Sequence, residues 1–314
     1  MSITPGYKDK RKFIMMALKR QVDDKGTDYI ANGAAPVAIL TTGLAVNPYQ
    51  SEQITRDLDD GQSGGQPVIQ TGEKITITAP VEWAGSGTDV TPAAWSPLVQ
   101  LAARDETVNV SDVTHNRILN ASNELDGTVY FYWEGMWHIL LAGKASLSKA
   151  GKMGEIPKIT AEIQGIYGDT VEGAPPTPSF TAFQKPLPFS QANTTFTLDG
   201  QALNLYEYEL ADNNSIEHDE GTEINQIYID DWSEEGKFII EAPALSTFDP
   251  FALIKAASVV PFEITHGIAA GEIVKEASAG VQLLTIQSSP QKGKQCWDIG
   301  FRVIRGNDSV LTTA

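Results

Sequence analysis

The feature that most constrains the fold of this chain is a pattern of residues that occurs twice in its sequence. Residues 72–103 read as a charged turn, an alternating strand, an Ala-Pro pair, a loop and a short helix with Pro97 in its first turn. Residues 236–256 repeat this order with a shorter loop and with Pro250 in the first turn of the helix. Proline is favoured there because the N–H groups of the first turn have no intrahelical partner. The repeat predicts two copies of one strand–loop–helix domain.

The rest of the chain has mainly the periodicity of strands. We expect short helices over 96–104 and 249–257, each opened by a polar cap residue before its proline, and we expect Pro80 to end the first repeat strand. Residues 12–22 can form another short helix, and the Gly-, Lys- and Ser-rich stretch 143–154 reads as a mobile loop. Further strands are expected over 37–44, 53–56, 127–141 with a turn at 134–135, 159–167, 195–198, 202–210, 227–230, 281–286 and 297–304.

Length and proline content predict how the chain divides. A chain of 314 residues exceeds the size at which one hydrophobic core usually keeps growing, so two domains are expected. The Pro-rich stretch 171–178 is stiff and unsuited to a sheet interior. The predicted fold is mainly β, with two tandem β-sandwich domains that each carry one short flanking α-helix. The predicted division is a basic arm and lead-in over 1–36, a first domain over 37–170, a linker over 171–178 and a second domain over 179–314.

The charge of the chain is distributed unevenly. Residues 1–20 carry six basic side chains and one acidic one, which is +5, whereas the stretches 21–173 and 174–314 each carry −11, and together these give the net charge of −17. An acidic surface argues against tight wrapping of nucleic acid, because that interaction neutralises phosphates with basic side chains. We therefore expect DNA not to bind this protein specifically.

Cysteine content and hydropathy exclude several classes of protein. Cys296 is the only cysteine, so the sequence predicts neither a disulfide framework nor a thiolate metal site. No apolar run approaches the roughly 20 residues of a membrane span, so no membrane insertion is expected. Residues 1–20 lack the sustained apolar core of a secretory signal, which indicates folding in a reducing cytoplasm.

A search for catalytic, metal and cofactor motifs finds no site. The histidines are scattered without the spacing of a metal site, and the acidic turn at 57–61 lacks the Gly and Glu that a calcium loop requires. The acidic residues on either side of Trp232 read as another solvated turn. No nucleophile elbow or phosphate-binding loop is present. We therefore expect no enzyme activity, no catalytic residue, no metal and no cofactor. The four histidines are His115, His138, His218 and His266.

Several short stretches resemble one protein family, and they occur in order along most of the chain. They are RKF at 11–13, KGTD at 25–28, the expected strand over 37–44, Arg56 before an acidic turn, GKA at 143–145, GEIPKI at 154–159, GIY at 165–167, FTLDG at 196–200 and LADN at 210–213. Each stretch alone is loose, and only their order is specific. Together they resemble the tail tube (major tail) proteins of tailed phages, in the type that carries a duplicated domain.

The resemblance implies a structural role in a virion. Tail tube proteins assemble into stacked rings whose inner strands form a continuous barrel around a DNA channel. A duplicated chain would form a ring of three copies with pseudo-six-fold symmetry. The implied partners are other copies of the chain and the tape measure, tail terminator and distal tail proteins, with DNA passing through during ejection into the host. The implied location is the virion tail, reached after assembly in the host cytoplasm. The family has no catalytic residues.

The basic arm is the candidate contact between stacked rings. Its charge of +5 opposes the −11 of each half, and its apolar side chains can pack on a neighbouring copy. The candidate contact residues are Lys10, Arg11, Lys12, Phe13, Met16, Lys19 and Arg20.

Two other classes of protein stay open on the sequence alone. A carbohydrate-binding or adhesive β-sandwich module would expose aromatic side chains. Trp95, Trp133, Trp137 and Tyr130 could form such a platform, but positions in the core or at a subunit interface are the preferred interpretation for them. A β-sandwich hydrolase would need a convergent acid–base pair. Self-assembly into rings or tubes separates the structural role from both.

Overall fold

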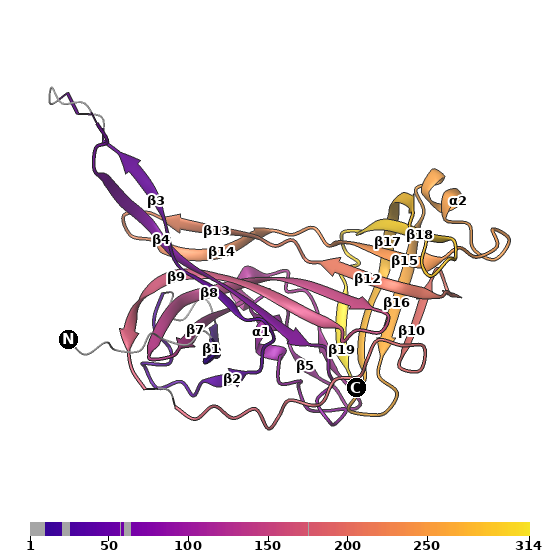
Figure 1. The fold of residues 1–314 in the computed structure, drawn as a ribbon, viewed down its shortest axis with the longest axis horizontal. Coiled ribbons are helices and arrows are strands. Elements are labelled where there is room, and N and C mark those ends of the chain that lie inside the picture. Colours follow the sequence, from indigo (N-terminus) through magenta and orange to yellow (C-terminus); the bar gives the residue numbers. More distant parts are fainter. Residues whose placement is uncertain (1–9, 21–25, 57, 60–63, 175) are drawn as a thin grey trace.

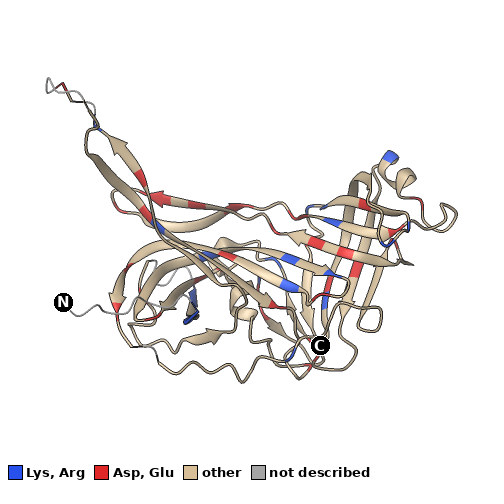
Figure 2. Ribbon diagram, in the orientation of Figure 1, with Lys and Arg blue, Asp and Glu red and all other residues tan. Residues whose placement is uncertain are grey.

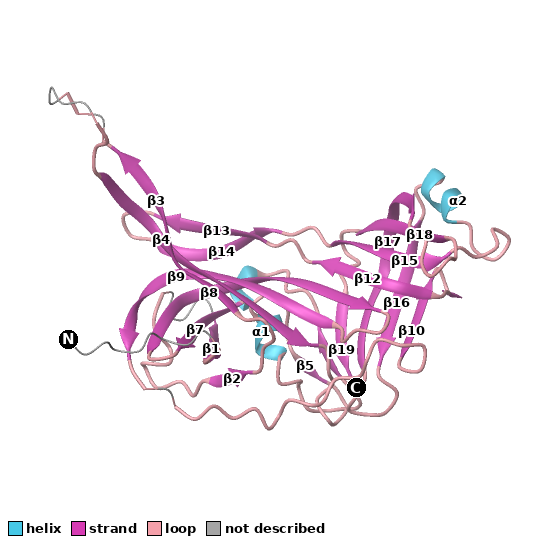
Figure 3. Cartoon of the chain, viewed as in Figure 1, coloured by secondary structure: helices cyan, strands magenta, loops and turns pink. Residues whose placement is uncertain are grey.

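The computed structural model describes the chain apart from residues 1–9, 21–25, 57, 60–63 and 175. Strands dominate the described residues, with two short α-helices, so the prediction of a mainly β fold is confirmed (Figure 3). In the first half the strands are β1 (Lys12–Arg20), β2 (Val37–Ile39), β3 (Ala45–Thr55), β4 (Val68–Glu82), β5 (Thr107–Val108), β6 (Val113–His115), β7 (Leu125–Trp133), β8 (Met136–Lys152) and β9 (Lys158–Glu172).

The second half adds ten strands and the second of the two helices. The strands are β10 (Thr194–Leu198), β11 (Gln201–Ala202), β12 (Leu205–Ala211), β13 (Ser215–Glu220), β14 (Asn225–Asp231), β15 (Glu235–Glu241), β16 (Val259–His266), β17 (Val274–Ser288), β18 (Cys296–Val303) and β19 (Val310–Thr313). The helices are α1 (Ser96–Gln100) and α2 (Pro250–Lys255), within the two expected ranges. A single 3₁₀ turn covers Ala121–Asn123.

The strands of the two halves pair in the same order. In the first half the order is β2-β1-β7-β8-β9-β4-β3, and in the second it is β11-β10-β16-β17-β18-β15-β12. The helix stands at the same place in both, after β4 in the first half and after β15 in the second. This shared order is what a duplicated domain would show, while the division into tandem domains with the stated boundaries stays a prediction.

Each half also carries a long antiparallel hairpin. In the first half β3 and β4 form one that extends well beyond the body of the molecule (Figure 1). In the second half the hairpin begins as β12 and β15 and continues as the separate two-stranded sheet β13–β14. The β13–β14 hairpin lies beside the first one, where the carboxylate of Glu220 accepts a hydrogen bond from the backbone N–H of Gly72 at 2.9 Å.

The expected helix over 12–22 is wrong, because residues 12–20 form strand β1. This strand lies between β2 and β7 and pairs with both. Its side chains at Ile14 and Met16 are buried in the core. The apolar residues of this stretch fit both a helical stripe and an alternating strand, and the available strand partners decided between the two.

The expected mobile loop over 143–154 is also wrong, because most of it belongs to β8. Ala145, Leu147 and Lys149 are buried at alternate positions of the strand. The composition suggested a loop, but this alternation is the signal of a half-buried strand. Strand β2 is shorter than the expected 37–44.

Pro80 does not end its strand, and Ser96 does not cap its helix. Pro80 lies inside β4, opposite Thr160 of β9 and beyond the last pair of β4 with β3, so no ladder bond needs its missing N–H. In α1 the cap position is Trp95, which makes no side-chain cap, whereas Asp249 caps α2 by accepting a hydrogen bond from the N–H of Ala252. The prediction of a proline in the first turn is confirmed for both helices.

One apolar cluster runs through both halves. It joins side chains of the first half such as Trp83 and Leu98 to side chains of the second such as Tyr208 and Phe238. The indole of Trp83 stacks on the ring of Tyr208 with 6.3 Å between centroids. After β9 the chain crosses the surface of the first half, where the buried ring of Phe189 packs against Gly151 (Figure 1). The two halves therefore share a core.

Candidate functional site

The two halves meet at a seam formed by strands β8 and β12. Residues 148–152 of β8 pair antiparallel with residues 207–211 of β12, beyond the point where β8 pairs with β7. A second contact joins β19 to β6. Within the 17-stranded sheet of the described residues, the seam makes one continuous run of eight strands, which we call the eight-stranded sheet. Its order is β3-β4-β9-β8-β12-β15-β18-β17.

A group of buried charged side chains lies at this seam, and we call it the ion cluster. Arg104 Nε lies 3.0 Å from Asp212 Oδ2, and Arg104 Nη2 lies 2.8 Å from Glu234 Oε1. Lys149 Nζ lies 3.1 Å from Asp212 Oδ1 and 2.8 Å from Glu276 Oε1. All five side chains are buried. Asp212 therefore holds two cations that come from different parts of the first half.

Neighbouring groups add further hydrogen bonds to the ion cluster, although Glu276 Oε2 has no partner among the described residues. Arg104 donates to the backbone carbonyl and, at 3.1 Å, to the hydroxyl of Ser309, whose own N–H donates to Glu234 at 2.9 Å. The guanidinium of Arg117 lies over the ring of Trp232, 4.2 Å from its centroid. Burying a charge requires such partners, because an unpaired ion in the interior is costly.

The environment shifts the pKa values of the cluster in different directions. Burial opposes ionisation of Asp212, but Arg104 and Lys149 outweigh it and hold the pKa of this carboxyl well below its usual range. For Glu234 burial is the larger effect, and it raises the pKa despite the nearby Arg104. Burial, with Arg104 close by, lowers the pKa of Arg117 to about 10. Asp212 is thus the carboxylate on which the cations of the cluster depend.

Sequence reasoning missed the ion cluster. It assigned Glu234 to a solvated acidic turn beside Trp232, and the structure shows that this interpretation is wrong for Glu234, which is buried. It also left Lys149 in an expected loop. Lys149 lies in an apolar alternation with Ala145 and Leu147, and a lysine at such a position requires a buried counter-ion. That signal could have predicted a buried ion pair, but not its partners.

The eight-stranded sheet has an open edge at each end. Within the described residues, β3 pairs only with β4. At the other end, residues 284–288 of β17 extend past the last pair with β16, at Gln282, and pair only with β18. Apolar side chains lie exposed at both ends, with Ile54 at 53% and Leu284 at 42% of their accessible surface. The edge of β17 resembles the part of β8 that β12 covers at the seam.

The two repeated helices differ in how far they are covered. Leu98 and Val99 of α1 are buried, and the side-chain amide of Asn214 in the second half donates to the backbone carbonyl of Ala145 beside this helix at 2.8 Å. In α2 the ring of Phe251 is 49% exposed, although it touches Trp297. One copy of the helix thus lies inside the chain near the seam, and the other lies at the surface.

Most of the candidate contact residues of the basic arm belong to the folded body of the first half. From Lys12 onward they belong to β1, with Met16 buried and Phe13 partly buried against Tyr132. Lys10, Arg11 and Arg20 are exposed, and Arg11 lies 3.4 Å from Glu134. Lys19 lies over the ring of Tyr29, 5.5 Å from its centroid. The exposed basic side chains remain candidates for a contact with another copy, but Met16 is a core residue.

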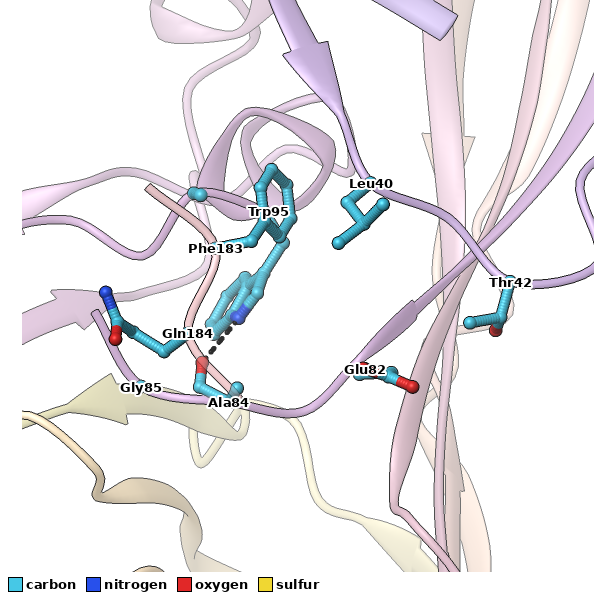
Figure 4. Close-up of a pocket in the computed structure, with 9 residues that line it drawn as sticks. Leu40, Thr42, Glu82, Ala84, Gly85, Trp95, Phe183 and Gln184 are labelled. Carbon is cyan, nitrogen blue, oxygen red and sulfur yellow. Dashed lines mark hydrogen bonds between the residues drawn. The ribbon is translucent and has the colours of Figure 1, made fainter. Parts of the chain in front are cut away.

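The proposed aromatic platform is mostly interior. Trp95 and Trp137 are buried, and Trp95 donates to the carbonyl of Ala84 at 2.8 Å (Figure 4). The cavity beside Trp95, shown with Phe183 and Gln184 in Figure 4, has a volume of about 20 Å³. A space of that size holds about one water molecule, so it is no sugar or cofactor site. The acidic turn expected at 57–61 lies largely outside the described residues.

Three buried histidines predict a loss of stability in mild acid. Burial lowers the pKa of His115, His138 and His266. Because the unfolded chain then binds protons more readily, stability is present above about pH 6.5 and is lost as the pH falls below that value. His115 accounts for part of this loss, because its Nε2 has no hydrogen-bond partner among the described residues.

Urea unfolding measured between pH 7.5 and pH 5.5 checks this expectation. The unfolding midpoint should fall across this range, and the fall should be smaller for His115→Gln than for the parent chain. His218→Gln is the control, since His218 hydrogen-bonds Asn225 on the solvent-exposed hairpin. An equal pH dependence in His115→Gln and the parent chain would contradict the assignment.

Comparison with known proteins identifies no relative: no protein-family model matches the chain, and no curated protein matches it. Among the described residues, no group of three or more His, Cys, Asp or Glu side chains is arranged to hold a metal ion. In the same part of the chain, no helix is long and apolar enough to cross a membrane. The functional proposal therefore depends on the seam and on the open edges of the sheet.

Proposed function

We propose that this protein is a structural subunit that assembles with copies of itself into rings, and that stacked rings form the tail tube of a phage. The observation that carries the proposal is the eight-stranded sheet with open edges at β3 and β17. An open edge presents unpaired backbone groups that favour pairing with another strand, and closure into a ring removes both edges at once. The seam between β8 and β12 supplies an example of such a junction within the chain.

The pairing order defines how the junction between copies forms. Strand β12 stands in the second half where β3 stands in the first, and β17 stands where β8 stands. The junction inside the chain joins β12 to β8. The corresponding junction between chains joins β3 of one copy to residues 284–288 of β17 in the next. A head-to-tail contact of this kind closes into a ring when its rotation divides a full turn.

Three copies give a ring of plausible bore. Strands spaced about 4.8 Å apart and tilted by about 40° form a closed barrel of about 50 Å backbone diameter when three eight-stranded sheets join. The diameter grows roughly linearly with strand number, so six copies would double it. The three-copy ring leaves a channel for a DNA duplex after side chains are added. Stacking of such rings would involve the exposed Lys10, Arg11 and Arg20, together with other tail proteins at the ends.

The charges on the exposed face of the sheet suit passage of DNA without binding. Lys152 Nζ lies 3.5 Å from Glu207 Oε2, and Lys237 Nζ lies 3.3 Å from Glu209 Oε1. Figure 2 shows mainly acidic positions on β12 and β15, and Lys237 is the one basic residue of these two strands. Phosphates therefore meet few basic side chains free of a carboxylate partner on these strands, and tight binding requires such basic groups. No specific observation favours the carbohydrate-binding alternative, because two of its four aromatic side chains, Trp95 and Trp137, are buried and the other two are only partly exposed.

Electron microscopy of the purified chain tests the proposal. We expect negative-stain images of the parent protein to show rings or tubes with three copies per ring by native mass spectrometry. Leu284→Lys should keep the fold, because this side chain is exposed in the single chain, but it should abolish rings by placing a charge at the junction. Val110→Lys, at a 97% exposed position between β5 and β6, is the matched control and should assemble normally. A parent chain that stays monomeric at high concentration would refute the proposal.

A further inference from the structure

The charges at the seam are divided strictly between the halves. Every cation of the ion cluster, and the adjacent Arg117, belongs to the first half of the chain, and every carboxylate belongs to the second. The cations are Arg104, Arg117 and Lys149, and the carboxylates are Asp212, Glu234 and Glu276. Formally the three positive charges balance the three negative ones only when a first half meets a second half.

Such a cluster discriminates between partners more than it stabilises a fold. Replacing a buried ion group by apolar side chains of similar size is often neutral or stabilising, because desolvation offsets the Coulomb attraction. Removing one side alone is strongly unfavourable, because it leaves an uncompensated buried charge. The side chains of Arg104 and Lys149 have no solvent exposure. Each would therefore be an uncompensated buried charge if the partner strand brought no carboxylate to it.

The natural wrong partner for the β8 edge is β3 of a second copy. Strand β3 is the counterpart of β12 in the pairing order, and its outer edge is open. The only charged side chain of β3 is Glu52. The cations at the seam need three carboxylates, which come from Asp212, from Glu234 before β15 and from Glu276 of β17. If β3 took the place of β12, it would leave buried cations unpaired.

We propose that the ion cluster is a pairing discriminator that reserves the β8 edge for the second half of the chain and rejects β3 of another copy. The open β17 edge carries no such requirement, because residues 284–288 are uncharged. The discriminator acts within one chain and holds whether or not copies form rings. In a ring, β17 would then be the edge, within the described part of the chain, that β3 of another copy can join.

The test uses the full chain with a protease site inserted after Thr177, in an exposed stretch between the halves. The chain is folded and purified intact, cleaved, and diluted in an analytical ultracentrifuge to measure the affinity of the two fragments for each other. Lys149→Met removes one cation of the cluster. Lys144→Met is the matched control, because Lys144 is equally buried but pairs with Glu124 at 3.0 Å inside the first half.

We expect the cleaved parent protein and Lys144→Met to stay associated with the same affinity. Lys149→Met should weaken the association by about 100-fold or more, because Asp212 and Glu276 lose a buried partner. Equal affinities for Lys149→Met and Lys144→Met would overturn the proposal, since the cluster would then have no role in recognition between the halves.

A second variant separates discrimination from stability. It replaces the five residues of the ion cluster and the adjacent Arg117 by apolar side chains, so that no buried charge is left without its partners. The substitutions are Arg104→Met, Arg117→Met, Lys149→Met, Asp212→Leu, Glu234→Met and Glu276→Met. We expect its thermal stability to equal or exceed that of the parent, while native mass spectrometry of the cleaved protein shows complexes of two first-half fragments that the parent never forms. A stable variant without such complexes would overturn the proposal. If this variant does not fold, the comparison of the two lysine variants decides.

Discussion

Asp212→Asn is expected to lower the free energy of unfolding by about 3–5 kcal/mol, one of the largest effects of any single substitution in this chain. Asp212 is the carboxylate that Arg104 and Lys149 share, at 3.0 Å and 3.1 Å. An amide of the same shape fills the site but leaves both cations with less than their full counter-charge in the interior. The fall should appear in urea titrations as a lower midpoint.

The control for this prediction is Glu263→Gln. Glu263 also pairs with a lysine, Lys275 at 2.6 Å, but both side chains are partly exposed to solvent. Exposed pairs of this kind are worth about 0–1 kcal/mol, so its midpoint should scarcely move. A small effect of Asp212→Asn, comparable with that of Glu263→Gln, would show that water reaches the ion cluster.

Deletion of residues 12–20 is expected to prevent the first half from folding. This stretch is strand β1, which pairs with β2 on one side and with β7 on the other. Its loss would expose two sheet edges and remove the buried Ile14 and Met16. Circular dichroism and limited proteolysis should therefore show an unfolded or aggregated first half. A detached docking arm would instead leave a folded chain after the same deletion.

A single substitution measures the same effect more finely. Met16→Ala should cost about 2–5 kcal/mol of unfolding free energy, in the range for truncating a buried methionine to alanine. Arg20→Ala, at the exposed end of the same strand, should change it by no more than about 0.5 kcal/mol. An equally small loss of unfolding free energy in Met16→Ala and Arg20→Ala would show that β1 contributes little to the core.

The two long hairpins stand at the same place in the pairing order of their halves but have different surroundings. The β13–β14 hairpin covers an apolar spot of the first half, where Ile227 packs with Ala142 and Ile166. The β3–β4 hairpin exposes Ile54 and Ile69. One hairpin is therefore packed on the first half, whereas the other exposes apolar side chains. Under the proposed function, the exposed hairpin would be the one that joins a further copy.

Local signals in the sequence were enough to predict several elements. Asp199 and Gly200 lie between the expected strands over 195–198 and 202–210, and they close the β10–β11 hairpin. Both have positive φ, at 53° and 71°, as a tight primed turn requires, although the stretch 202–210 divides between β11 and β12. Pro97 and Pro250 located both helices, and the Glu134-Gly135 turn separated β7 from β8. These signals depend on backbone conformations a few residues long, which the sequence determines without help from distant segments.

The seam, the ion cluster and the place of β1 were decided only by the tertiary structure. Arg104 and Asp212 are 108 residues apart, so no periodicity relates them, and each charge alone reads as an ordinary surface residue. Residues 12–20 suit either a helix or a strand, and the free edges of β2 and β7 made the strand the more stable choice. Alternation along 145–149 indicated burial, but the partner that neutralises Lys149 comes from strands of the other half. The sequence thus determined local turns and helix starts, whereas pairing between distant strands determined which charges became buried.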